Sequence, residues 1–462
     1  MMHIFTHLLR ISYHKVICMA LMCLFPGIVL AISPRDIKRQ FKSAPGKSGG
    51  IYYAYPYTTD SIPKFPEGYE PVYISHYGRN GSRWAINEKQ YPLVLDILTE
   101  QQQLGNLTPE GEEVMHKVKI IADHAKGHAG ELSPLGQRQH KGIAERMMKR
   151  TPELFADSAN ISALSSIVPR CIISMSAFTE RLKELNPSLQ IARSASPGDM
   201  DFIAFSTPEA RKVAADSLGW RADHKRFREK IVPQERLMKV LFKETPTLED
   251  PVLFLKTLHD IAVTTQNVDL EVDLLSLFTT DELFAFWQAI NYNMYVRHAN
   301  SPEGKKAGMY SARSLLDDII TRADKALGLA PTVSAESETT AKADFISEIE
   351  DEAAVQPKVQ LRFGHDTNLI RLLALMQLEG CAESEADPKQ YYAAWQDFRV
   401  SPMAANLQLI FLQPSNQTNP SDDNTLVLIL HNERPVTVPI DSAIPSPFYR
   451  WSDLKRLWSS TQ

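Results

Sequence analysis

The feature that most limits the fold is an alternation of strand-like and helix-like segments near both ends of the chain, interrupted by a long helical stretch. Strand-forming segments lie at residues 72–74 and 162–168, and again at 359–363 and 407–412. Between them, residues 201–354 are dominated by the apolar spacing of helices. We therefore predict an α/β core with an open sheet flanked by helices, built from both ends of the chain around an inserted, mainly helical domain.

The helical interruption divides the chain into predicted parts. Residues 32–200 and 355–462 form the core, and residues 201–354 form the inserted domain. The segment 331–358 is acidic and rich in Ser and Ala, which predicts either a mobile linker or a solvated helix. Residues 32–70 are rich in Lys, Gly, Pro and Tyr, and they predict an irregular arm that wraps around the core.

Residues 1–31 have the organisation of an export signal. Arg10 and Lys15 precede an apolar run, and Ala31 closes a small-residue cleavage site. The run is short for a membrane span and contains Pro26, so a retained anchor is the weaker interpretation. The mature chain is predicted to be periplasmic or secreted after cleavage near Ala31, without a transmembrane anchor.

The charge balance limits the classes of partner. The 462 residues carry a formal net charge of −5, and loss of the two basic residues of the signal lowers it to about −7. An acidic chain is a poor match for nucleic acid. A polyanionic ligand would have to enter a local basic pocket against the overall charge.

Cysteine and histidine patterns give no metal motif. Cys171 and Cys381 remain after removal of the signal, both in apolar segments, and the sequence leaves open whether they pair. No CxxC, HExxH or EF-hand pattern is present. Gly127, between His124 and His128, favours a loop over a helical metal-binding pair. We therefore predict neither a metal site nor a cofactor.

Helices are predicted where apolar residues recur with a period of three to four. They cover residues 88–104, 108–125, 137–150, 173–185, 236–242, 252–264 and 282–296, with a short helical turn at 274–275. A strand at 425–430 follows the strand at 407–412, and residues 436–439 are a candidate hairpin partner.

Residues 71–84, PVYISHYGRNGSRW, lead from a short strand into a loop with two arginines. Gly78 and Gly81 let the backbone turn and approach a ligand closely. A guanidinium is a planar, charged fork that matches phosphate or carboxylate oxygens, so Arg79 and Arg83 on one loop predict an oxyanion site. The alternative is a pair of solvated surface arginines.

Two further strand ends carry polar side chains. Arg170 follows the strand at 162–168, and His365 and Asp366 follow the strand at 359–363. Ligands of open α/β sheets bind outside the carboxyl ends of the strands, so these residues and the arginine loop are predicted to meet in one crevice. There the arginines and His365 would bind phosphate oxygens, and a protonated Asp366 would give its proton to the leaving alcohol. The structural alternative for Asp366 is a helix N-cap.

Together these segments resemble the histidine phosphatase superfamily, in its acid phosphatase and phytase branch, and most of all the bacterial multiple inositol-polyphosphate phosphatases. The family pattern is R-H-G-x-R near the N-terminus, an arginine in mid-chain and a C-terminal H-D or H-A-E. The corresponding segments here are Arg79-Asn80-Gly81-Ser82-Arg83, Pro169-Arg170-Cys171 and Gly364-His365-Asp366-Thr367, with further similarity at residues 132–139 and 402–406. The resemblance implies a phosphatase fold and metal-independent chemistry on phosphate monoesters such as inositol polyphosphates.

The chain departs from the family pattern at Asn80. The family's nucleophile is the histidine at this position, and a carboxamide nitrogen has no available lone pair with which to take up a phosphoryl group. His76 lies four residues earlier, roughly 13 Å away in a strand that rises about 3.3 Å per residue. Attack requires the reacting atoms to be within about 3.5 Å. Asn80 can still donate a hydrogen bond to a bound phosphate.

Three hypotheses for the function remain open. The first is a working phosphatase of altered mechanism, in which water attacks the phosphate directly. The second is a non-catalytic relative that binds inositol phosphates or another phosphate ester, and the third is a protein whose motifs serve only the fold. A basic run in the helical insertion fits a solvated helix face and is left outside the predicted site; its residues are Arg221, Lys225, Arg226, Arg228 and Lys230.

Overall fold

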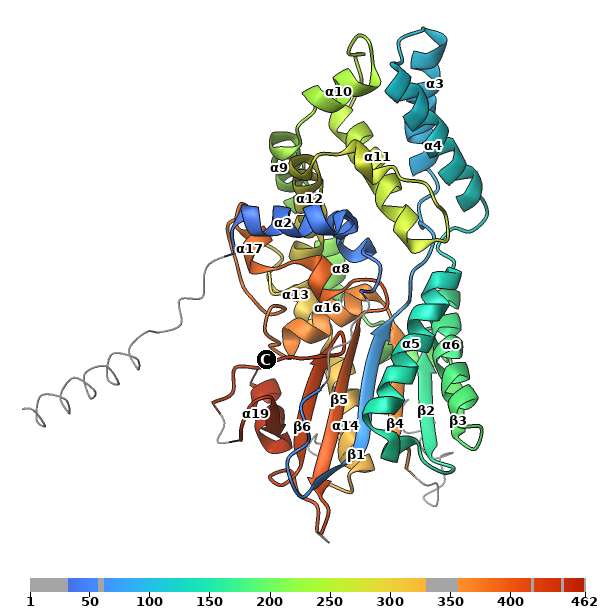
Figure 1. The fold of residues 1–462 in the computed structure, drawn as a ribbon. Coiled ribbons are helices and arrows are strands. Elements are labelled where there is room, and N and C mark those ends of the chain that lie inside the picture. The colour runs from blue at the N-terminus through green and yellow to red at the C-terminus, as the bar shows by residue number, and fades with distance from the viewer. Residues whose placement is uncertain (1–31, 57–61, 330–355, 417–418, 442–443, 461–462) are drawn as a thin grey trace, which may run out of the picture.

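A sheet, covered by helices on both of its faces, organises the fold. The structure, a computed structural model, describes residues 32–56, 62–329, 356–416, 419–441 and 444–460. Within them, one eight-stranded sheet forms the lower half of the molecule in Figure 1. Helices flank this sheet, and a second group of helices lies above the ends of its strands. The predicted α/β fold with an open sheet flanked by helices is confirmed.

The sheet joins the two ends of the chain. Its order is β3-β2-β4-β1-β5-β6-β7, with β8 paired to β6. The strands are β1 (Tyr69–Arg79), β2 (Asn160–Ser165), β3 (Gln190–Ser194), β4 (Val359–Gly364), β5 (Asn406–Pro414), β6 (Leu426–His431), β7 (Arg434–Pro435) and β8 (Phe448–Arg450). Because β1 lies between β4 and β5, the sheet cannot form from either end of the chain alone.

The helices agree with most of the predicted segments to within four residues at each end. They are α2 (Pro34–Ser43), α3 (Gln90–Gln103), α4 (Pro109–Ala125), α5 (Pro134–Arg150), α6 (Pro169–Leu185), α7 (Met200–Ile203), α8 (Pro208–Ala214), α9 (Trp220–Ile231), α10 (Glu235–Leu241), α11 (Pro251–Thr264), α12 (Thr280–His298), α13 (Ala307–Tyr310), α14 (Arg313–Ala326), α16 (Asp366–Leu375), α17 (Tyr391–Ala394), α18 (Asp397–Val400) and α19 (Trp451–Ser459). Short 3-10 helices are η1 (Pro45–Tyr52), η2 (Pro152–Phe155), η3 (Pro197–Asp199), η4 (Thr265–Asn267) and η5 (Leu275–Leu277).

The strands that carry the predicted site residues are parallel neighbours. β3, β2, β4 and β1 run parallel, whereas β5 and β6 are antiparallel, so the sheet is mixed. The register places Arg79 opposite Gly364, and Ser165 opposite Phe363. The carboxyl ends of β1, β2 and β4 therefore meet at one edge of the sheet, where ligands of α/β proteins bind.

Alternate residues of β1 face two separate cores. On one face Ile74 packs in a cluster with residues of α5 and α6. On the other face Tyr73 and Tyr77 pack in a cluster with residues of α14, α16 and α19. Burial on both faces fixes the register of β1, because a slip by one residue would exchange the two sets of side chains.

The second helical layer lies above the carboxyl ends of the strands (Figure 1). Its apolar core combines residues of α3 and α4 with residues of α10, α11 and α12. A bridge between Leu107 and Phe242 ties the two groups together. The layer therefore draws helices from two parts of the chain, and the boundaries of the inserted domain at 201–354 stay a prediction.

The prediction of an irregular arm at residues 32–70 is wrong for the first part of this segment, which forms α2 and η1. Ser33 and Asp36 make a reciprocal capping box at the start of α2. Phe41 is fully buried and packs edge-on against Trp287 of α12, with ring centroids 5.4 Å apart. The sequence carries the capping signal, but the Gly- and Pro-rich residues around it obscured it.

Some predictions concern residues outside those described: the export signal at 1–31 and most of the acidic segment at 331–358. The edge strand β3 was not predicted, because its short, largely exposed sequence lacks a clear apolar alternation. Among the described helices, none is both long and apolar enough to cross a membrane.

Candidate functional site

Arg79 is the last residue of β1 and is completely buried. Its Nη1 donates to the carbonyl oxygens of Ile51 and Ser401, at 2.8 and 2.6 Å, and its Nη2 lies 3.4 Å from the carboxylate of Asp366. Burial lowers the pKa of Arg79 to about 10, against the effect of Asp366, so the side chain remains a cation at neutral pH. Arg79 is therefore a buried charge held by the fold, and the interpretation as a solvated surface arginine is wrong.

Asn80 holds the side chain of Arg170. Its Oδ1 accepts a hydrogen bond from Nε of Arg170 at 3.3 Å, and its Nδ2 donates to the carbonyl oxygen of Gly81 at 2.9 Å. A guanidinium can only donate, so this contact fixes the orientation of the carboxamide. Asn80 is buried, and its carboxamide orients an arginine, a contact that the sequence did not predict.

The loop after Asn80 packs directly on the start of α5. A Cβ atom at Gly81 would lie 2.6 Å from the carbonyl oxygen of Gly136, and one at Gly136 would lie 2.3 Å from the carbonyl oxygen of Ser82. Oγ of Ser133 donates to that Ser82 oxygen at 3.0 Å and also caps α5. The lack of a side chain at Gly81 is thus required by close packing of two backbones, whereas we had expected it to serve approach to a ligand.

Arg83 and Arg170 approach one space from the loop after β1 and from the first turn of α6. Arg83 is 4% exposed, and its guanidinium lies 5.3 Å from the centroid of the Tyr52 ring. Arg170 is half-buried; burial lowers its pKa, and the charge of Arg83 acts in the same direction. Two cations that destabilise one another in a partly buried space favour an anion between them.

His365 is held as a neutral ring. Its Nδ1 lies 3.5 Å from Nη2 of Arg170, which can only donate, and its Nε2 therefore carries the proton and donates to Oγ of Ser166 at 3.1 Å. Burial lowers the pKa of His365 to about 4, more than Asp366 raises it. Both ring nitrogens are engaged by the protein.

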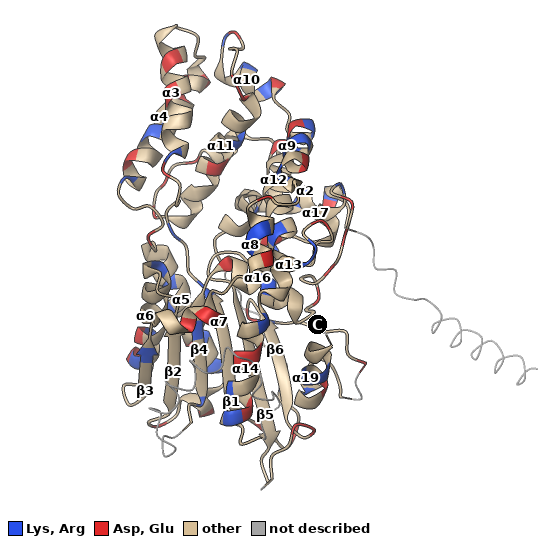
Figure 2. Cartoon of the chain, turned by 180° about the vertical axis from the view of Figure 1, so that it is seen from behind, with Lys and Arg blue, Asp and Glu red and all other residues tan. Residues whose placement is uncertain are grey.

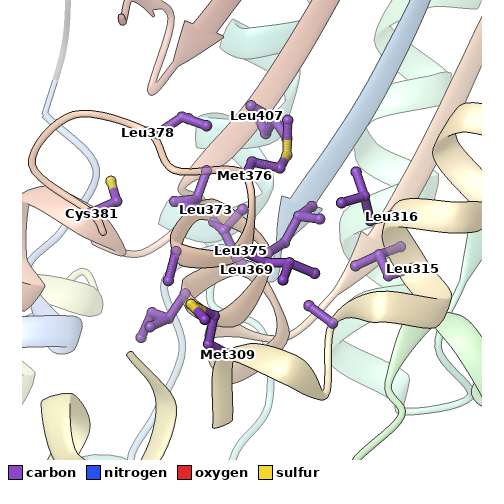
Figure 3. Close-up of a cluster of buried hydrophobic side chains, with 14 of the residues drawn as sticks. Met309, Leu315, Leu316, Leu369, Leu373, Leu375, Met376, Leu378, Cys381 and Leu407 are labelled. Atoms are coloured by element: carbon purple, nitrogen blue, oxygen red, sulfur yellow. The ribbon is translucent and has the colours of Figure 1, made fainter. Parts of the chain in front are cut away.

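Asp366 opens α16 and faces the arginines. Burial would raise the pKa of its carboxyl group, but the charges of Arg79 and Arg83 hold that pKa below its ordinary value. The carboxylate is thus ionised, whereas the predicted proton donor would be protonated. Figure 3 shows the apolar side chains that anchor α16 and its surroundings, among them Leu315, Leu316, Leu369, Leu373 and Leu407.

A cavity of about 440 Å³ lies at the carboxyl ends of the strands. Its wall includes Asn80, Arg83, Arg170 and Asp366. Arg79 contacts Asp366, and His365 contacts Arg170, from positions behind this wall. The structure brings the predicted site residues together around one cavity, and their roles stay predictions.

The helical layer supplies cavity residues that the sequence analysis missed. Lys256 and Asp260 of α11 form an ion pair on the wall, and Asn293, Arg297 and His298 come from the last turns of α12. The available signal was weak: polar residues recur in the last turns of a helix that is otherwise mostly apolar. Such residues are more often surface positions, so spacing alone did not single them out.

The basic run on α9 lies mostly in solvent. Figure 2 shows acidic and basic residues alternating along this helix. Arg226 pairs with Asp223, and Lys225 lies 3.8 Å from Glu229. Of the described residues of α9, His224 alone lines the cavity.

His76 is buried within β1, between the rings of Phe178 and Phe363, with centroids 5.4 Å from each. Burial lowers the pKa of His76 to about 3. The ring lies in an apolar core on one face of the sheet, away from the cavity wall. It is therefore not placed to reach a group bound in the cavity.

The cavity wall does not include Cys171, Cys381, His124 or His128. Cys171 and Cys381 are both buried and free. His124 and His128 stack on the indole ring of Trp84, with centroids 5.9 and 4.6 Å away. The described residues contain no group of three or more His, Cys, Asp or Glu side chains that could hold a metal ion.

The fold and the site define an α/β protein with an arginine-rich cleft at the carboxyl ends of parallel strands. Residues 79–432 match the model of the histidine phosphatase superfamily (branch 2), and the chain belongs to this superfamily. The resemblance read from the sequence is thereby confirmed.

Solved structures show the same fold. The multiple inositol polyphosphate phosphatase of Bifidobacterium longum, in complex with inositol hexasulfate, is similar with a TM-score of 0.66 and 18% identity, over 89% of this chain and 97% of that chain. The phytase from D. castellii is similar with a TM-score of 0.61 and 12% identity, over 90% of this chain and 85% of that chain. No curated protein sequence gives a significant match to this chain.

Proposed function

We propose that the cavity binds the phosphate group of a phosphate monoester and that the ligand is an inositol polyphosphate. Buried donors of the cavity wall carry the proposal: within the described chain, Nε of Arg83 and Arg297 and Nε2 of His298 have no hydrogen-bond partner. Buried donors are normally paired. A phosphate group is rich in acceptors and complements this set.

The ligand class is supported by the superfamily and by the relatives with known structures. The Bifidobacterium longum enzyme carries inositol hexasulfate in its structure, a ring with several anionic groups. Arg297 adds positive charge to the wall of the present cavity beyond that of the strand ends, whereas the charge of Lys256 is balanced by Asp260. An inositol ring that bears several phosphates would use Arg297 together with the cations of the strand ends.

Asn80 argues for binding without covalent catalysis. Its nitrogen is an amide that already donates to the backbone, so no phosphohistidine can form at this position. We therefore propose a non-catalytic phosphate-ester binder within a phosphatase superfamily.

Hydrolysis by direct attack of water is the second candidate, because the ionised carboxylate of Asp366 lines the cavity. There it would accept a proton from water as the water oxygen attacks phosphorus and the ester P–O bond breaks, and it would pass that proton to the leaving ester oxygen, which gives an alcohol and inorganic phosphate. In this mechanism an Asp366→Asn variant would lose activity, because an amide is no base.

Calorimetry with inorganic phosphate and with inositol hexakisphosphate tests the binding proposal. Arg170→Met should weaken both affinities by at least tenfold, because a hydrogen bond to a charged group contributes about 1.5–3 kcal/mol. Arg138→Met is the matched control, since Arg138 pairs with Asp269 on the surface and lies away from the cavity. Equal affinities of the parent and the Arg170→Met variant would contradict the proposed site.

Phosphate release from an aryl phosphate and from inositol hexakisphosphate distinguishes the two candidates. A binder should release none, and Asn80→His should gain turnover together with an acid-labile phosphoenzyme. Parent activity that is lost in Asp366→Asn would favour attack by water. Parent activity that survives both Asp366→Asn and Arg79→Ala would refute the site.

Export is the other part of the proposal. The chain would be secreted or periplasmic after cleavage near Ala31, as residues 1–31 suggest. The N-terminal residue of protein recovered from the extracytoplasmic fraction, determined by mass spectrometry, tests the cleavage. Recovery of uncleaved protein from the cytoplasm would contradict it.

A further inference from the structure

The last turn of α12 presents two side chains to the cavity that the strand ends do not provide. Arg297 and His298 line it together with Arg83 and Asp366. They belong to the helical layer, whereas Arg83 follows β1 and Asp366 follows β4. Arg297 and His298 therefore form a part of the cavity wall that is separate from the predicted phosphate site.

Arg371 of α16 sets the tautomer of His298. Its Nη2 lies 3.3 Å from Nδ1 of His298, and a guanidinium has donors but no acceptor. Nδ1 must therefore accept, and the ring proton must lie on Nε2. Arg371 is only 5% exposed, and its Nη1 donates to the carbonyl oxygen of Phe205 at 3.2 Å, which also accepts from Asn368 at 2.9 Å. A buried network thus fixes the imidazole.

The free end of this ring is a donor that the protein leaves unused. In the parts of the chain that are described, neither Nε2 of His298 nor Nε of Arg297 has a hydrogen-bond partner. His298 is 2% exposed and lies on the cavity wall, so the missing acceptor would have to come from a molecule held in the cavity. A buried donor without an acceptor destabilises the protein, and a ligand oxygen in the cavity would satisfy it.

Two other roles for His298 conflict with this geometry. A nucleophile needs an available nitrogen lone pair, but that of Nδ1 faces Arg371 and Nε2 carries the proton. A general acid needs a cationic ring, and burial, together with the charges of Arg371 and Arg297, holds the pKa of His298 well below its ordinary value. His298 therefore remains a neutral donor.

We infer that Arg297 and His298 form a second binding subsite, in which Nε2–H of His298 donates a hydrogen bond to an oxygen of a second phosphate group on the ligand. Arg371 is the positioning residue of this subsite. The charge of Arg297 favours an anionic oxygen over a hydroxyl group. The inference rests on the proposed function, and it restricts the ligand to esters that carry at least two phosphate groups.

Two conservative variants test the Nδ1 acceptor and the Nε2 donor of His298 separately. In His298→Asn, the amide oxygen takes the place of Nδ1 and keeps an acceptor for Arg371, but nothing replaces the distal donor. In His298→Gln, the amide nitrogen takes the place of Nε2 and restores that donor. Melting temperatures of both variants report whether the fold is intact.

Calorimetry with two ligands measures the effect. The asparagine variant should bind inorganic phosphate as the parent does, and inositol hexakisphosphate on the order of tenfold more weakly. The glutamine variant should recover part of that loss. If the role of His298 were merely structural, the substitution would lower the affinities for both ligands equally or would change neither affinity.

The outcomes distinguish this inference from the proposed function. The second subsite is overturned if the asparagine variant binds inositol hexakisphosphate as tightly as the parent while Arg170→Met loses affinity for it. The proposed function would still stand. A parent protein that binds neither ligand overturns both. Nitrogen-15 NMR of the parent needs no ligand and should show a protonated Nε2 and a bare Nδ1 of His298 at neutral pH; the opposite tautomer overturns the subsite.

Discussion

Gly81→Ala should destabilise the protein and weaken its affinity for phosphate together. The new Cβ would lie 2.6 Å from the carbonyl oxygen of Gly136, whereas ordinary contact begins near 3.4 Å. The two backbones must therefore separate by about 0.8 Å, and no side-chain rotation can relieve the overlap. Overpacking of this kind costs about 1–3 kcal/mol. At roughly 2 °C per kcal/mol for a large chain, the melting temperature should fall by about 2–6 °C.

The assay compares two glycine-to-alanine changes near the same helix. At Gly142 the nearest atom to a new Cβ is Nη1 of Arg146, at 3.0 Å, so one side-chain atom has to shift by only a few tenths of an ångström while Nε and Nη2 keep their bonds to Glu433. Gly142→Ala should therefore stabilise α5, by up to about 1 kcal/mol, with unchanged phosphate affinity. If Gly81→Ala melts at the parent temperature and binds phosphate as tightly as the parent, the close packing of the loop on α5 does not position the site, and the reasoning is refuted.

Three further predictions concern the protein interior. Burial lowers the pKa of His76 and His140 to about 3, from 6.5 when unfolded, so the unfolded chain binds protons that the folded chain cannot. Stability should fall as pH falls through that window, and His76→Phe should flatten the slope of melting temperature against pH; an unchanged slope would contradict this. Glu433 is fully buried against Arg146, and Glu433→Gln should cost about 3 kcal/mol in urea unfolding, a loss that Lys149→Gln at the exposed surface should not produce. Burial raises the pKa of the Cys171 thiol to about 11, so it should react with a thiol reagent only on unfolding, and rapid reaction in the native state would show that the site core opens.

The strand ends were predictable because each is marked by neighbouring residues in the sequence, a short apolar run followed by a polar side chain. Arg79 ends an apolar strand, whereas Arg170 and Asp366 lie in the first turns of the helices that follow two other strands, and the topology of parallel neighbours brings such positions to one edge of the sheet. Helix starts such as that of α4 were also predictable, since Thr108 caps it and Pro109 follows.

The far wall of the cavity was not predictable, because its residues reach the site only through tertiary packing. Arg297 and His298 end a helix of the second layer, and nothing in their spacing shows that this end lies over the strand ends. The orientation of Asn80 was also hidden, because it depends on a partner ninety residues away, Arg170. The ionised state of Asp366 depends on the burial of Arg79, which the sequence presented as a loop residue.

The central position of β1 has a consequence for synthesis of the protein. β1 pairs on both sides with strands from the last quarter of the chain, β4 and β5. A ribosome that adds about 5–20 residues per second needs on the order of 20–70 s to reach from β1 to the end of β5. During that interval the apolar segment at 72–74 has unpaired edges on both sides and is open to aggregation. The nascent chain should therefore depend on a holding chaperone that binds this segment until the last strands emerge.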